Sequence, residues 1–159
     1  MKITCLSALL ILSIVSCTNE NKKLQSKIDS LQVQLNKTYK PGFGEFMSSI
    51  QVHHEKLWFA GQNRNWKLAD FEIHELEEAL QGIQEYCKDR PETKSIAMIN
   101  GVIDSVQKTI QQKNILAFNT SFIALTNTCN ECHQATQHEF NLIQLPTTPP
   151  FSNQTFKEK

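Results

Sequence analysis

Apolar side chains recur at alternating steps of three and four residues along four successive segments of this chain. The segments cover roughly residues 45–62, 68–88, 92–112 and a last stretch that begins at Asn114 or Ile115. This repeat gives each helix one apolar face and packs antiparallel helices at small crossing angles. No segment shows sustained strand alternation, and the connections are short. The sequence therefore predicts an all-α domain, an antiparallel up-down-up-down four-helix bundle preceded by a helical stalk.

The apolar face of the last segment leads directly into a cysteine motif. Its members are Ile115, Phe118, Phe122, Leu125, Cys129 and Cys132, and His133 follows at once. The C-x-x-C-H pattern is typical of covalent haem c attachment, with the histidine as the proximal iron ligand. Half of a zinc site and a thioredoxin-like redox pair are the alternatives. A zinc site needs further ligands, and a redox pair normally belongs to a βαβ unit.

In architecture and motif position the chain resembles the cytochrome c′ family. That family comprises exported four-helix bundles with a single CxxCH near the C-terminus, on the last helix. The sequence is also similar to low-spin relatives in which a methionine of the first helix takes the sixth iron position. The resemblance covers roughly residues 43–140 and depends on architecture and motif position more than on residue identity. It implies one haem per chain, held by Cys129, Cys132 and His133.

The ligand opposite His133 determines the chemistry. Met47 and His54 lie on the apolar face of the first segment, which is antiparallel to the last one in this topology. We expect Met47 to be the distal iron ligand, with His54 as the alternative; for either residue, plain core packing is the other explanation. Phe122 and Leu125 are expected to line the cofactor.

Coordination by histidine and methionine suits single-electron transfer, so the sequence predicts an electron-carrying cytochrome. If Met47 only packs, a five-coordinate iron could bind or sense NO or CO. A haem-stabilised structural lipoprotein is a third alternative. No set of residues typical of catalysis, such as a Ser/His/Asp triad or a phosphate-binding loop, is present in the sequence, so no enzyme is expected. The protein that exchanges electrons with this one cannot be named from the sequence.

The N-terminus reads as a lipoprotein signal peptide over residues 1–16. Lys2 precedes an apolar stretch that is too short for a membrane span, and small residues lead up to Cys17. We expect Cys17 to be lipidated, which would place the exported chain on a bacterial cell membrane, facing the periplasm or the cell exterior; ordinary cleavage that leaves a free Cys17 is the alternative. The chain has 16 basic and 16 acidic side chains, a balance that gives no basic surface for nucleic acid.

Residues 17–42 are expected to form the lipidated N-terminus, a helical stalk and a linker. The stalk carries Leu24, Ile28, Leu31 and Leu35 at heptad spacing, which could also pair two copies into a homodimer. The haem domain is assigned to residues 43–145, where Cys87 is expected to be buried filler. Residues 146–159 hold three prolines and favour an extended tail. Phe151 and Phe156 predict that this tail folds back along the bundle, a disordered terminus being the alternative.

Overall fold

The computed structural model describes residues 20–35, 37–38 and 40–158, and it divides into two units, Met1–Lys40 and Pro41–Lys159. The first unit holds a helix over residues 20–35, in the region predicted as a stalk. The apolar heptad residues of this helix, Leu24, Ile28, Leu31 and Leu35, are each more than half exposed. The signal segment and Cys17 lie outside the described residues. Among the helices that are described, none is both long and apolar enough to cross a bilayer.

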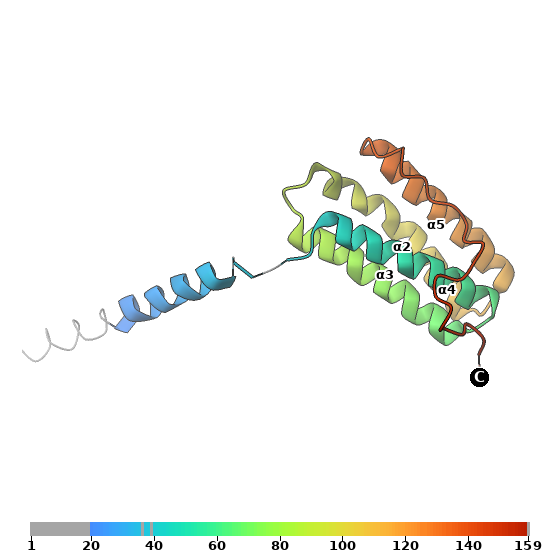
Figure 1. Cartoon of the computed structure of the whole chain (residues 1–159), viewed down its shortest axis with the longest axis horizontal. Helices are drawn as coiled ribbons and strands as arrows, with labels where there is room; N and C mark the ends of the chain where they lie inside the picture. Colours follow the sequence, from blue (N-terminus) through green and yellow to red (C-terminus); the bar gives the residue numbers. More distant parts are fainter. Residues whose placement is uncertain (1–19, 36, 39, 159) are drawn as a thin grey trace, which may run out of the picture. The chain divides into compact units, whose positions relative to one another are not determined.

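The second unit is all-α across its described residues. Its helices are α2 (Phe43–Gln62), α3 (Trp66–Tyr86), η1 (Pro91–Ile99), α4 (Asn100–Gln111) and α5 (Ile115–Ala135). Neighbours in sequence pack side by side and antiparallel, α2 against α3 and α4 against α5, while α4 also packs on α3 (Figure 1). α2 and α5 approach each other closely over only a short stretch.

Asparagine caps fix where two of the helices begin. The Asn65 side chain accepts a hydrogen bond from the Leu68 backbone N–H at 3.2 Å, and Asn114 accepts one from Ala117 at 3.1 Å. Each cap satisfies a backbone donor that has no partner within its own helix. α3 and α5 therefore start immediately after tight turns, which agrees with the short connections expected from the sequence.

The third predicted helix differs from the expectation of one α-helix over residues 92–112. Its first half is the 3₁₀ helix η1, which begins at Pro91, and only the second half is the α-helix α4. A 3₁₀ helix has three residues per turn. The buried Ile96 and Ile99, three residues apart, therefore lie on the same face of η1, and the four-residue step to the buried Ile103 falls in α4.

Aromatic side chains fill one end of the core. Phe118 and Phe122 of α5 are fully buried, with ring centroids 5.8 Å apart, and Trp58 of α2 lies 4.9 Å from Phe122. Gly61 allows α2 to approach this cluster, because a Cβ at this position would clash with the Phe118 ring. Cys87 is also buried, which confirms its expected role as core filler.

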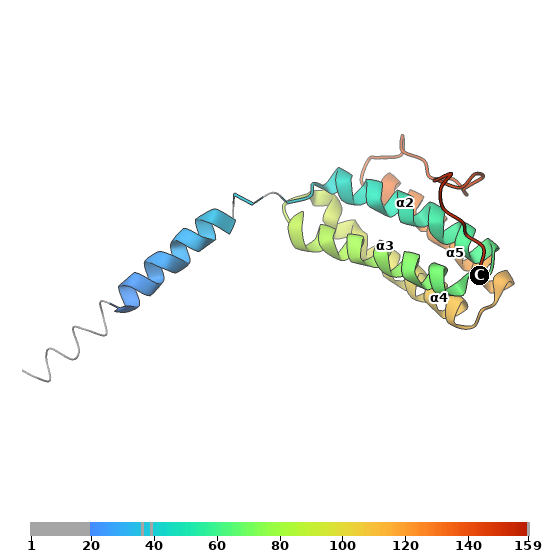
Figure 2. The same ribbon diagram turned by 60° about the horizontal axis from the view of Figure 1, so that its bottom comes forward.

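Residues 138–158 form no helix or strand and run back along the helices (Figures 1 and 2). Phe156 is only 5% exposed and packs against Phe59 of α2, with ring centroids 5.7 Å apart. Phe151 remains 42% exposed beneath the ammonium group of Lys56. The burial of Phe156 agrees with the expectation that the tail folds back.

Candidate functional site

The C-terminal part of α5 carries the cysteine motif. Cys129 and Cys132 are three residues apart, so their side chains lie one helical turn apart on the same face. The helix ends at Ala135, with Thr136 as its C-cap, and the following Gln137 has a positive φ of 61°. The backbone N–H of His138 donates to the His133 carbonyl at 2.7 Å. The motif is therefore held in regular helix up to its histidine, and the chain turns back directly afterwards.

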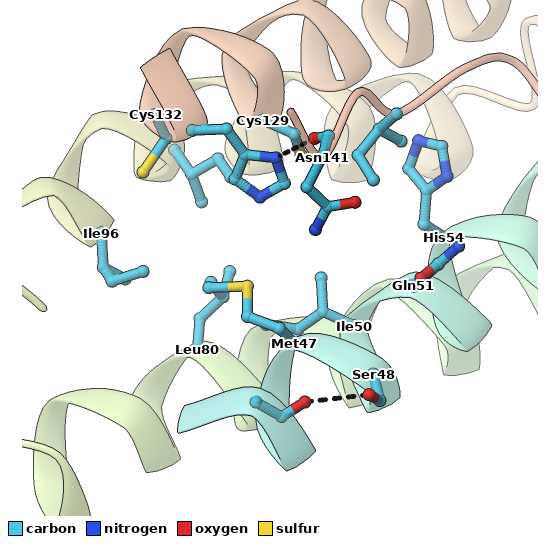
Figure 3. A pocket seen from close by; sticks show the side chains of 14 residues that line it. Met47, Ser48, Ile50, Gln51, His54, Leu80, Ile96, Cys129, Cys132 and Asn141 are labelled. Atoms are coloured by element: carbon cyan, nitrogen blue, oxygen red, sulfur yellow. Dashed lines mark hydrogen bonds between the residues drawn. The ribbon is translucent and has the colours of Figure 1, made fainter. Parts of the chain in front are cut away.

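Both cysteines and His133 line a cavity of about 210 Å³ between α2 and α5. Four other parts of the domain complete its walls: Gly44, Met47, Ser48, Ile50, Gln51 and His54 from α2, Leu80 from α3, Ile96 and Ile99 from η1, and Asn141 and Ile143 from the tail. Figure 3 shows Met47 and Ile50 on one side and Cys129 and Cys132 on the other. The surface of the cavity is mostly apolar, and its polar side chains are Ser48, Gln51, His54, His133 and Asn141.

The two thiols are protonated and reduced. Burial raises the pKa of Cys129 to about 12, and the neighbouring Cys132 adds to this shift. Burial also raises the pKa of Cys132, whose thiol donates to the Ser95 carbonyl of η1 at 3.7 Å. Thiol–disulfide exchange needs a lowered thiol pKa, so these shifts run against a redox pair. In the part of the chain that the structure describes, no three His, Cys, Asp or Glu side chains converge as metal-ion ligands.

His133 is half-buried and is held by one short hydrogen bond. Its Nδ1 lies 2.6 Å from the Asn141 carbonyl oxygen, the contact drawn as a dashed line to Asn141 in Figure 3. A carbonyl only accepts, so Nδ1 carries a proton, and in the neutral ring Nε2 has the lone pair. Histidines that bind metals are commonly fixed in this way by a backbone carbonyl on the other ring nitrogen. His133 is thus oriented as a ligand would be.

Met47 lines the same cavity from α2 and is half-buried against the core. Its thioether is a soft sulfur donor of the kind that binds haem iron. The structure therefore brings together the two thiols, the imidazole and the thioether singled out in the sequence. No protein-family model, curated protein or solved structure matches the chain.

His54 also reaches the cavity, but its ring is committed to the core. Its Nε2 lies 2.8 Å from Thr126 Oγ1, and that hydroxyl donates its own proton to the Phe122 carbonyl at 3.0 Å. Nε2 must therefore be the protonated nitrogen of His54. Burial lowers the pKa of His54 from 6.5 to about 4, so the ring is neutral at pH 7.

Phe122 and Leu125, expected beside the cofactor, are fully buried and do not line the cavity. Phe122 packs instead on His54, with ring centroids 4.5 Å apart, and on Trp58. The helical repeat correctly placed both residues on the inner face of α5. It could not show that the cavity begins one turn later, at Cys129.

Two groups of residues were missed by the sequence reasoning. Asn141 and Ile143 reach the cavity from the tail, and no periodic pattern marks them. Glu72 is 1% exposed and lies 2.7 Å from His53 and 3.8 Å from Lys56. The helical spacing could have predicted its burial, because Glu72 lies three residues after the buried Ala69 and four before the buried Leu76.

Proposed function

We propose that this protein is a membrane-anchored c-type monohaem cytochrome that carries single electrons. In this proposal the helices of residues 43–145 form an antiparallel up-down-up-down four-helix bundle, with the haem between α2 and α5. The observation that carries it is the convergence on one cavity of Cys129, Cys132, the Nδ1-bonded His133 and Met47. The two cysteines and the histidine are the residue types that a haem c site requires, and methionine is a ligand opposite the histidine in cytochromes c.

The residues present fit the group in chemistry and in space. The cavity of about 210 Å³ adjoins one of about 160 Å³, with which it shares Met47, Cys132 and His133. It also adjoins one of about 290 Å³, with which it shares Gln51, His54, Asn141 and Ile143. Together these spaces lie in the range of roughly 300–1,000 Å³ that is usual for sites of organic ligands and cofactors. Cys132 lines the first two of these spaces, and Cys129 lines the first.

Each of the four side chains has a definite task in this proposal. The Cys129 and Cys132 thiols would each add across a vinyl group, with sulfur bonding to one carbon and the thiol hydrogen going to the other. His133 would donate its Nε2 lone pair to iron, and Met47 its thioether sulfur. Bound haem would supply an iron that exchanges one electron at a time. An iron with a protein ligand on each face of the haem would suit electron transfer and not catalysis.

Binding of small gases is the second candidate, and one observation favours it. Met47 packs against the buried core, so its side chain has a structural reason to be there even without iron. If it packs only, the iron keeps an open position for NO or CO.

Absorption spectra of the matured protein distinguish these two functions. We expect sharp reduced bands of a low-spin iron that do not respond to CO. Met47→Ala should convert this spectrum to a high-spin one that shifts with CO. The matched control is Met98→Ala in η1, because Met98 is 45% exposed, and it should leave the spectrum unchanged. A wild-type spectrum that already shifts with CO would replace electron transfer by gas binding.

We also propose, on the sequence alone, that Cys17 is lipidated and that the lipid tethers the exported chain to a bacterial membrane. The helix over residues 20–35 would then act as the stalk between lipid and haem domain. Its exposed heptad residues leave room for pairing with a second copy.

A further inference from the structure

The tail returns to the cysteine motif immediately after α5. Residues 138–143 lead from the end of the helix to the cavity, where Asn141 and Ile143 line its wall. The turn is closed by the Asn141 backbone N–H, which donates to the His138 carbonyl at 2.9 Å. A segment without helix or strand therefore forms part of the site.

Asn130, one of the two residues between the haem cysteines, fastens this segment. Its side-chain Nδ2 donates to the Ile143 carbonyl at 2.9 Å, and the Ile143 backbone N–H donates to its Oδ1 at 2.8 Å. The amide thus pairs with both backbone groups of one residue, as a neighbouring strand would. Both bonds are partly buried, which limits competition from water.

The clamped residue lies two positions from the group that holds His133. Fixing the backbone of Ile143 fixes the direction of the Asn141 carbonyl, which accepts from His133 Nδ1 at 2.6 Å. The Asn141 side chain is not needed for this bond, because the carbonyl belongs to the backbone. Asn130 and His133 lie on the same helix, and the hydrogen bonds that connect their side chains run through residues 141–143 of the tail.

We propose that Asn130 is a positioning residue for His133. It holds residues 141–143 so that the Asn141 carbonyl sets the tautomer and the ring orientation of the proximal histidine. The effect on the reduction potential rests on the proposed haem function. The clamp, which is the pair of hydrogen bonds between Asn130 and Ile143, does not depend on that function. A carbonyl on Nδ1 makes the imidazole a stronger electron donor. Loss of the clamp should therefore destabilise the oxidised iron relative to the reduced iron and raise the reduction potential.

The test compares Asn130→Ala with wild type in the full chain. The first readout is hydrogen exchange of the Ile143 amide, which we expect to quicken about tenfold or more when two hydrogen bonds are lost. The second is the reduction potential of the matured protein, expected to rise. Asn127→Ala, one turn earlier on the exposed face of α5, is the matched control and should change neither.

Asn130→Asp guards against a variant that fails to fold. It keeps the oxygen that accepts from Ile143 but loses the donor, so the increase in exchange of the Ile143 amide should be intermediate. Unchanged exchange at Ile143 in both variants would overturn the clamp. Faster exchange with an unchanged potential would overturn the positioning role. A chain that takes up no haem would instead refute the proposed function, while the exchange result would still decide the clamp.

Discussion

His54 lines the cavity and is at the same time part of the buried core. The ring is 3% exposed, and its Nε2–H is used by Thr126. The hydrogen bond to Thr126 engages the protonated Nε2, so in the neutral ring Nδ1 carries the lone pair. His54 therefore contributes to the core of the folded chain through its Nε2.

The burial of His54 predicts a loss of stability in mild acid. In the unfolded chain the group takes up a proton below pH 6.5, whereas in the folded chain it does so only near its lowered pKa of about 4. The contribution of His54 to the free energy of unfolding is therefore fully present above pH 6.5. It decreases by up to about 3 kcal/mol as the pH falls to about 4. Urea unfolding across this range measures the decline.

The matched variant is His54→Gln, whose amide can still donate to Thr126 but does not titrate. In His54→Gln the free energy of unfolding should no longer show this decrease between pH 6.5 and about 4. His74→Gln, at a position 55% exposed, should show the same decrease as wild type. Parallel pH curves for wild type and His54→Gln would show that His54 does not cause the effect.

At the level of the helices, three ends share one arrangement without any glycine. Arg64, Lys113 and Gln137 follow α2, α4 and α5 with positive φ values of 56°, 53° and 61°. At each end two backbone N–H groups donate back into the last turn, as Asn114 does to Thr109 at 3.1 Å and Lys113 to Ile110 at 2.9 Å. This is the Schellman pattern, in which glycine is the usual residue at the left-handed position.

Replacing one of these residues by glycine should stabilise the protein. Lys113→Gly removes the cost of placing a side chain in the left-handed region, so we expect a gain of about 0.5–1 kcal/mol in the free energy of unfolding. Lys108→Gly, within α4 and also exposed, should instead lose about 1 kcal/mol. Thermal or urea unfolding measures both. Equal losses in the two variants would mean that Lys113 is not strained.

For the molecule as a whole, the periodicity of the sequence predicted the helical domain and its inner faces. It did not predict features that depend on contacts between residues distant in the chain. The three-and-four repeat indicated an all-helical domain and placed Cys129 and Cys132 on the inner face of α5. It could not indicate η1, because a 3₁₀ helix and an α-helix share steps of three. Nor could it find the pairing of Asn130 with Ile143, since polar contacts across 13 residues leave no repeat.

The tail also tests how the molecule holds together. Phe156 is the buried anchor of a segment with no helix or strand, so Phe156→Ala should release the tail while the helices stay folded. Limited proteolysis should then cut within residues 145–158 faster, by roughly tenfold. Phe151→Ala, at a position 42% exposed, should change the cutting rate little. Unchanged cutting of the Phe156 variant would show that the anchor lies elsewhere.

The central claim is that Cys129 and Cys132 bind haem covalently, and one mass measurement tests it most directly. After export from a host with haem-maturation machinery, trypsin should release residues 114–157, a fragment whose only cysteines are these two. We predict that its mass under denaturing conditions exceeds the peptide mass by one haem, and that the increase is absent when both cysteines are alanine. An unmodified fragment with two free thiols would contradict the account.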